Sequence, residues 1–128
     1  MAEFRARGGR VGGYHASMRL LLLTTTGART GQRRAVPLTY IPDGDRCVVT
    51  AGNGGSESHP AWYYNLLASS DVTVEMESEA FEAVAVIAEK AERAALYERF
   101  AAAYPQLADY QAQTSRQIPL VILTRRLR

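Results

Sequence analysis

The chain has 128 residues, of which 47% are hydrophobic and 22% charged, so it is long enough for one domain with a core of its own. No apolar stretch approaches the roughly 20 residues that span a bilayer, no secretory signal opens the chain, and the single cysteine, Cys47, excludes an internal disulfide. The formal net charge of +2 is low for a nucleic-acid module, which usually has a clearly basic face. We expect one cytoplasmic domain over residues 1–128.

The basic residues are concentrated at the start of the chain. Residues 1–46 carry a net charge of +5, whereas residues 47–99 carry −6. Fourteen of the fifteen basic residues are arginine, whose planar fork suits phosphate and carboxylate groups. This distribution predicts an anionic partner for the N-terminal third.

The first half of the chain predicts an N-terminal arm followed by three strands. Residues 1–16 are rich in glycine and arginine and have no clear period. The expected strands are 18–25, 34–41 and 46–51, separated by the turn sequences TGARTG and PDGD. Pro37 favours an edge position or a bulge in the second strand, because proline cannot donate to a strand ladder. We expect a three-stranded antiparallel meander.

The second half begins with the glycine-rich loop GNGGSES and a short helix over 60–67, which Pro60 would start. The remaining expected elements are strands 71–77 and 81–87, a helix over 89–103, a helical turn or two over 106–114 and a last strand over 118–123. This order predicts an α+β fold: a small antiparallel barrel of about six strands, with a short helix after strand three and a helical segment before the last strand.

Hydrolytic and metal chemistry lack support in the residues. His15, His59 and Cys47 give no metal-ligand spacing, and no serine stands in a G-x-S-x-G turn. We therefore expect no metal site.

The turn at 27–34 brings together Thr30, the arginines Arg29, Arg33 and Arg34, and glycine amides. These groups are equipped to hold an anion, although the same composition also fits a solvated turn.

Three further features could form a ligand site. GNGGSES offers unshielded amides or is a flexible connection, and Trp62 could stack on a planar ring or belong to the core. Tyr104 and Tyr110 carry phenols that can give a proton to a reacting oxygen. Together these features predict a pocket for a phosphorylated aromatic cofactor with room for a substrate.

Two long segments, LLLTTTGARTGQRRAVPL and AGNGGSESHPAWYYNLLAS, resemble the deazaflavin (F420)-dependent nitroreductase family. The segment YPQLADYQAQTSRQIPLVIL is similar to that family's pattern YPxYxxYQxxxxRxIPxxxL. The resemblance runs from about Gly8 to Leu123. It implies a split β-barrel that binds coenzyme F420, a phosphorylated, oligoglutamylated deazaflavin.

The resemblance also implies roles for individual residues. The implied cofactor contacts are Arg29, Thr30 and Arg34 for the phosphate and anionic tail, Val36, Pro37 and Leu38 for the ring pocket, the amides of Gly52, Asn53, Gly54 and Gly55, and Trp62 beside the ring. Tyr104 and Tyr110 match the tyrosines that face the substrate, and we take them as the catalytic candidates. Two departures are Gly52-Asn53 in place of a serine-lysine pair and Leu107 in place of a tyrosine.

The function that the resemblance implies is hydride transfer from the reduced deazaflavin to an electron-poor acceptor, such as a quinone, an activated alkene or a nitro compound. Two alternatives stay open: an F420 or small-ligand binding protein without turnover, and a reductase of the same barrel that uses FMN. Family members often carry an upstream amphipathic helix, so a weak association with a membrane surface is a further expectation. The expected partner is a small-molecule acceptor rather than nucleic acid.

Overall fold

The structure is a computed structural model that describes residues 19–77 and 79–126, so the expected N-terminal arm over 1–16 lies outside the described residues. The strands are β1 (Leu20–Thr26), β2 (Arg33–Thr39), β3 (Ile41–Asp43), β4 (Arg46–Thr50), β5 (Asp71–Met76), β6 (Glu79–Ile87) and β7 (Leu120–Arg125). The helices are α2 (Ala61–Ala68), α3 (Lys90–Ala103), α4 (Gln106–Ala112) and the 3-10 turn η2 (Asn53–Gly55). Within this described part, no helix is both long and apolar enough to cross a membrane.

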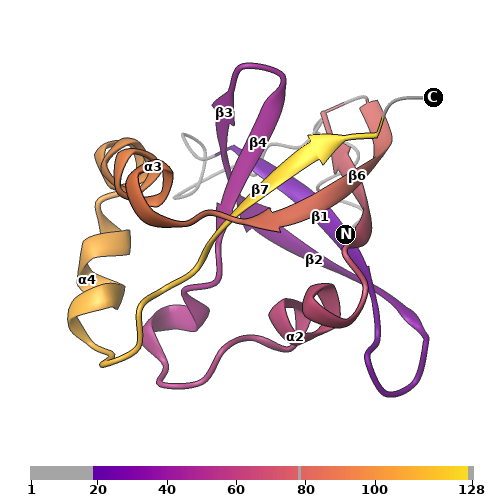
Figure 1. Ribbon diagram of the computed structural model, residues 1–128, viewed down its shortest axis with the longest axis horizontal. Helices are drawn as coiled ribbons and strands as arrows, with labels where there is room; N and C mark the ends of the chain where they lie inside the picture. Colours follow the sequence, from indigo (N-terminus) through magenta and orange to yellow (C-terminus); the bar gives the residue numbers. More distant parts are fainter. Residues whose placement is uncertain (1–18, 78, 127–128) are drawn as a thin grey trace.

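The strands form one antiparallel sheet in the order β2-β1-β5-β6-β7-β4-β3. The two outermost strands, β2 and β3, are separated in sequence by Tyr40 alone. The sheet must therefore curl until its edges come together, and the Tyr40 N–H donates to the carbonyl of Arg19 at this junction. Figure 1 shows the resulting curled sheet, with α3 and α4 on one side and α2 below it. The expected antiparallel barrel is confirmed.

The expected meander is wrong. The predicted strand over 34–41 is two strands, because the chain turns at the buried Tyr40 from one edge of the sheet to the other. Consequently β2 pairs with β1, whereas β3 pairs with β4 and β4 continues to β7. Within residues 19–77 and 79–126 the sheet has seven strands rather than about six. Of the two alternatives for Pro37, the edge position is the one found, since β2 is the first strand in the sheet order and its register with β1 is continuous through Pro37.

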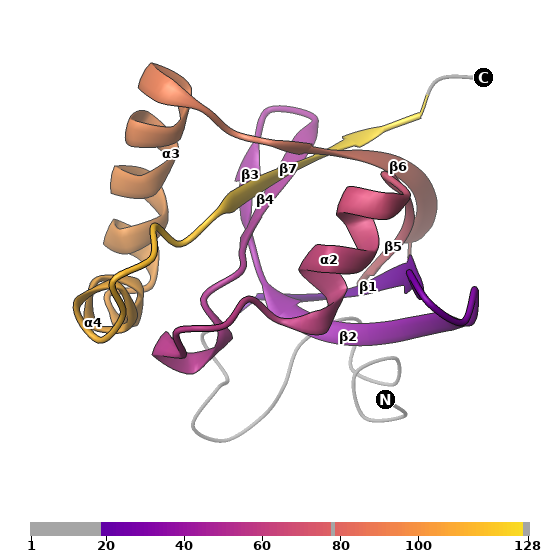
Figure 2. The same cartoon turned by 60° about the horizontal axis from the view of Figure 1, so that its bottom comes forward.

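The core is divided into two apolar clusters. The first fills the barrel and joins β1 to α2, with Leu21, Leu23, Trp62 and Leu66 among its buried members. The second lies under α3 and α4, where Phe100 is one of the residues packed against β7. Figure 2 shows α2 beside β1 and β2, and α3 and α4 on the opposite side of the molecule. Each helical layer therefore covers a different part of the sheet.

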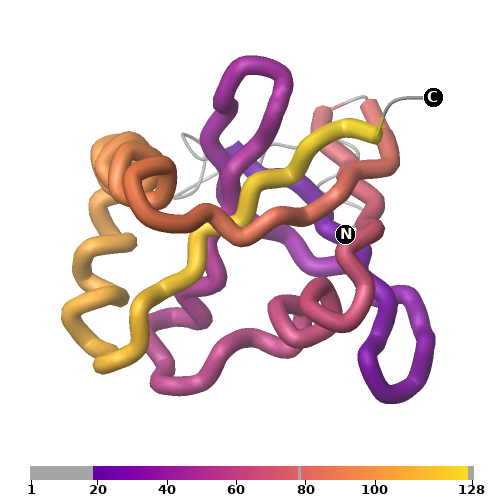
Figure 3. The backbone as a smooth tube through the Cα atoms, viewed as in Figure 1, coloured from indigo at the N-terminus to yellow at the C-terminus, as the bar shows by residue number. Residues whose placement is uncertain are grey.

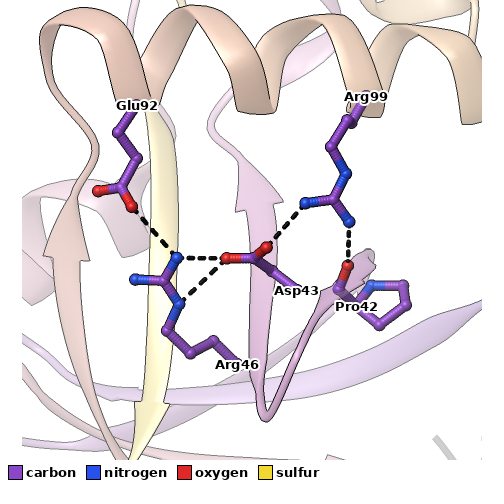
Figure 4. A network of polar contacts seen from close by, with 5 residues as sticks. All are labelled: Pro42, Asp43, Arg46, Glu92 and Arg99. Atoms are coloured by element: carbon purple, nitrogen blue, oxygen red, sulfur yellow. Dashed lines mark hydrogen bonds and ion pairs between the residues drawn. The ribbon is translucent and has the colours of Figure 1, made fainter.

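A polar network fixes α3 to the β3–β4 hairpin (Figure 4). Asp43 accepts hydrogen bonds from Arg46 Nε at 3.1 Å and from an Arg99 amino nitrogen at 2.7 Å. Arg99 also donates to the carbonyl of Pro42 at 2.7 Å, and Arg46 pairs with Glu92 at 3.2 Å. The hydrogen bonds from Arg46, and then those from Arg99, hold the pKa of Asp43 below its usual value. The predicted hairpin at PDGD thus also orients the helix above it.

Candidate functional site

A cavity of about 360 Å³ lies between the β2 edge of the sheet and the C-terminal helices. Its lining residues are Leu20, Pro37, Leu38, Thr39, Thr50, Gly52, Asn53, Phe100, Tyr104, Gln106, Leu107 and Tyr110. Ligand pockets typically measure about 300–1,000 Å³, so this cavity suits a planar ring system rather than a ring with a long tail. Six of the thirteen predicted site residues line it: Pro37, Leu38, Gly52, Asn53, Tyr104 and Tyr110.

The two candidate tyrosines differ in what their hydroxyl groups do. Tyr104 ends α3 and is 8% exposed, and its hydroxyl donates to the carbonyl of Tyr40 at 3.1 Å. The same oxygen accepts from the Arg19 N–H at 3.3 Å. Tyr110 lies on α4 and is half-buried, and its hydroxyl makes no hydrogen bond to another residue of 19–77 or 79–126. Of the two phenols that line the cavity, only the Tyr110 hydroxyl is therefore free to act on a ligand.

The loop after β4 forms the wall opposite α4. Gly52 lies so close that a Cβ there would be 3.4 Å from the Tyr110 ring. Asn53 lines the cavity in a left-handed conformation, with φ of 49°, and its side chain donates to the carbonyl of Ser58 at 2.9 Å. Gly54 and Gly55 lie outside the cavity lining. Gly55 has a φ of 86° and packs against Gln113, so its conformation and its space both require glycine.

The predicted alternative of a flexible loop is not what the structure shows, because two charged side chains fasten this segment. Arg116 donates to backbone carbonyls of the loop, and Glu57 accepts from the Thr114 hydroxyl and from the N–H and hydroxyl of Ser115. The hydrogen bonds from Thr114, and then from Ser115, lower the pKa of Glu57 to about 2. The loop is thus bound to the segment that follows α4.

His59 completes this attachment. Its Nδ1 lies 2.9 Å from an Arg116 amino nitrogen, and because arginine only donates, Nδ1 must be the acceptor of a neutral imidazole. Burial, and then the charge of Arg116, lowers the pKa of His59, in agreement with a neutral ring. The ring also packs against Tyr63, with centroids 4.5 Å apart.

The arginine turn lies at the far end of β2 from α4, as the tube in Figure 3 shows. Its base is held by Asn65, which accepts from the Ala28 N–H at 3.0 Å and donates to Thr25 at 3.1 Å. Arg29 is exposed and makes no hydrogen bond or ion pair with the other described residues. Thr30 accepts from the Gln32 N–H at 3.2 Å. The turn therefore has a fixed base and a free guanidinium group.

The structure separates the two neighbouring arginines of β2. Successive strand residues point to opposite faces, so Arg34 shares the face of Val36 and Leu38, which pack against the barrel core. Arg33 points to the other face, where it donates to Thr26 and Thr73. Among the described residues Arg34 donates only to Gln32, at 3.3 Å, so its guanidinium is less engaged than that of Arg33.

Trp62 and Val36 do not line the cavity. Trp62 is 8% exposed within the first core cluster and meets the Tyr63 ring edge-on at 6.5 Å. Its indole therefore serves the packing of α2 on the sheet, and the role beside a cofactor ring stays a prediction.

Arg116 and Glu57 were not among the predicted site residues. Arg116 is the arginine of the pattern YPxYxxYQxxxxRxIPxxxL, and this match is the one feature of the sequence that could have drawn attention to it. The pattern alone assigned no function to that arginine. Glu57 gave no signal, since its partners follow some 57 residues later in the chain. Among residues 19–77 and 79–126, no three His, Cys, Asp or Glu side chains are grouped in a way that could hold a metal ion.

Comparison with known proteins identifies the family. A family model described as F420H2-dependent quinone reductase matches residues 1–125. The chain is 39% identical over 132 residues to an F420H2-dependent quinone reductase of Mycobacterium tuberculosis, covering 98% of this chain and 87% of that protein.

Two solved structures agree with this result. One is described as an F420-H2 dependent reductase and has a TM-score of 0.76 at 35% identity, covering 81% of this chain and 92% of its own. The other, described as a domain-swapped dimer, has a TM-score of 0.78 at 34% identity, and the match covers 95% of this chain and 92% of that chain. The split-barrel fold and the resemblance found in the sequence are confirmed, and the chain belongs to the F420H2-dependent quinone reductase family.

Proposed function

We propose that the cavity between β2, the loop after β4 and α4 binds the ring of reduced F420 beside a quinone-type acceptor, and that the acceptor is reduced there. Family membership makes the chain an F420-dependent oxidoreductase. The observation that carries the location is the cavity itself, whose lining includes the apolar Pro37 and Leu38, Gly52 and Asn53 of the glycine loop, and Tyr110.

The residues present fit such a cofactor. Pro37 and Leu38 give apolar surface for a planar ring, and the N–H groups of Gly52 and Asn53 have no hydrogen-bond partner among the described residues. The cavity is too small for the phosphate and the oligoglutamate tail, which need a cationic seat elsewhere. Arg34 is three residues from Pro37, or about 10 Å along the strand, and Arg29 lies beyond it. These two arginines would hold the anionic tail.

The chemistry that F420 supplies when reduced and bound is a hydride. A quinone that accepts a hydride needs one proton to become a hydroquinone, and Tyr110 is the candidate donor because this residue lines the cavity and its hydroxyl has no partner among the described residues. Tyr104 keeps its hydroxyl on the Tyr40 carbonyl and fixes the end of α3. The protein thus binds, orients and protonates, while the redox chemistry belongs to the cofactor.

The first test is a fluorescence titration of the purified protein with F420, FMN and FAD in parallel, followed by anaerobic oxidation of reduced F420 with a soluble quinone. We expect saturable binding of F420 alone, a colourless protein after expression in a host without F420, and one quinone reduced per cofactor oxidised. FMN binding with a yellow protein would contradict the proposal in favour of the FMN reductase. F420 binding without quinone reduction would favour the binding protein without turnover.

Two expectations from the sequence stay predictions. The cytoplasmic location rests on the reducing environment that a free Cys47 fits, and a weak contact with membrane surfaces would involve the residues upstream of β1. Cys47 is in β4 as predicted, and burial raises the pKa of its thiol.

A further inference from the structure

Arg116 is absent from the cavity lining, yet it uses four of its five N–H donors on the segment that forms the cavity wall. Nε donates to the carbonyl of Ser56 at 2.9 Å, and one amino nitrogen lies 2.9 Å from His59 Nδ1. The other amino nitrogen donates to the carbonyls of Ala51 and Gly52, both at 3.0 Å. One guanidinium therefore fixes both ends of the loop.

The backbone of Arg116 is in turn held by α4. Gln111 donates to the Arg116 carbonyl at 2.7 Å and accepts from the Ile118 N–H at 2.9 Å. Gln111 follows Tyr110 in the helix, so Arg116 connects the wall that carries the free phenol with the wall that carries the glycine amides. Together with the bonds of Glu57 to Thr114 and Ser115, this side chain sets the spacing of the two walls.

The orientation of the amides follows from peptide geometry. In a trans peptide the C=O of one residue and the N–H of the next point in opposite directions. Since the carbonyls of Ala51 and Gly52 both point at Arg116, the N–H groups of Gly52 and Asn53 point away from it. Both residues line the cavity, and neither N–H has a partner among residues 19–77 and 79–126.

We propose that Arg116 is a positioning residue that turns the Gly52 and Asn53 N–H groups toward the cavity, where they donate to an electron-rich oxygen or nitrogen of the bound cofactor ring. This inference rests on the proposed function for the identity of the ligand. Two parallel N–H groups fixed before the ligand arrives bind without the cost of ordering the loop.

The conformation of the loop gives a second reason for such a device. Asn53, Gly54 and Gly55 have φ values of 49°, 64° and 86°, and a left-handed conformation is unfavourable for a residue other than glycine. Without Arg116, the Ala51 carbonyl would lose its donor and the Gly52 carbonyl would keep only the Gly55 N–H, so both peptides would be freer to rotate and the amides would turn with them. Lysine could keep the charge but not the fork that reaches several acceptors at once.

The test compares wild type, Arg116→Met and Arg116→Lys with the control Arg126→Met, which removes an exposed guanidinium paired with Asp71 away from the cavity. Amide proton chemical shifts of Gly52 and Asn53 are followed during titration with F420, and hydrogen exchange is measured at Gly55 and Ser56, whose N–H groups donate within the loop. We expect both cavity amides to shift on binding in wild type and in the control.

In Arg116→Met we expect the F420 Kd to rise about tenfold or more, from the loss of two oriented donors. The Gly52 and Asn53 shifts should be lost even at saturation, and exchange at Gly55 and Ser56 should be faster, with β1 unchanged. Arg116→Lys should give a Kd, amide shifts and exchange rates between those of wild type and Arg116→Met. It tests the role of Arg116 if the methionine variant does not fold.

Unchanged shifts at saturation, or an unchanged Kd, would overturn the inference even if the melting temperature fell, because a purely structural role predicts only that fall. If wild type and control alike fail to bind F420, the proposed function is contradicted, and the exchange comparison alone decides whether Arg116 fixes the loop.

Discussion

Replacing Tyr104 and Tyr110 by phenylalanine, one at a time, separates two roles that the sequence assigned alike. Tyr104→Phe removes a buried donor to the Tyr40 carbonyl and a longer contact with the Arg19 N–H. The Tyr40 carbonyl is left without its partner, whereas the N–H of the exposed Arg19 can bond to water instead. The loss in the free energy of unfolding is therefore close to that of one buried hydrogen bond, about 1–2 kcal/mol. For a domain of this size that corresponds to a fall in Tm of about 4–8 °C.

Tyr110→Phe should leave the stability unchanged and lower the turnover. Its hydroxyl has no partner among the described residues, so the free energy of unfolding should change by less than about 0.5 kcal/mol. Turnover with reduced F420 and a quinone should fall about 100-fold, as expected for the loss of a general acid. The assays are thermal unfolding and anaerobic steady-state kinetics on both variants. A Tyr104→Phe protein with unchanged Tm, or with the greater loss of turnover, would refute this assignment.

Three further outcomes are expected. Arg34→Ala should raise the F420 Kd about 3- to 10-fold with no change in Tm, since its one contact is an exposed bond to Gln32; equal affinities in a fluorescence titration would remove it from the anion seat. Leu107→Ala should cost about 2–5 kcal/mol in urea unfolding, because the side chain is 2% exposed, and a loss below about 1 kcal/mol would contradict its place in the core. The pKa of Glu57 is lowered to about 2, so its contribution to the free energy of unfolding is present above pH 4.5 and is lost as pH falls toward 2. Glu57→Gln should therefore flatten the acid part of the curve of stability against pH, and an unchanged acid part would argue against the attachment of Glu57 to Thr114 and Ser115.

Local patterns predicted most of the elements, because each pattern reflects whether an element is buried on one face or on both. The alternation of Val72, Val74 and Met76 marked β5, and the continuous leucines marked β1, whose Leu21, Leu22 and Leu23 are all fully buried. Tyr40 shows the limit of this approach. A single residue between two strands looks like the middle of one strand until the pairing of β4 with β7, some 70 residues apart, is known.

In the candidate site, too, local features could be predicted from the sequence and long-range contacts could not. Candidate residues of β2, the glycine loop and the C-terminal helices could be chosen from their types and from the family resemblance, and six of the thirteen line the cavity. The partners of Arg116 and Glu57 could not, because their hydrogen bonds join segments 57 to 65 residues apart. The composition of the turn grouped Arg33 with Arg34 and only the family resemblance selected Arg34, whereas strand alternation places the two on opposite faces.

The edges of the sheet carry a consequence for how the protein behaves at high concentration. No strand of the described residues pairs with the outer side of β2 or of β3, and open strand edges invite pairing between molecules. Each edge holds a proline, Pro37 or Pro42, which interrupts the row of donors, and β2 adds the charges of Arg33 and Arg34. Arg34, which is proposed to hold an anion, and its neighbour Arg33 therefore also oppose self-association. Variants that neutralise them should be compared at low protein concentration, where a change in affinity is not confused with the onset of aggregation.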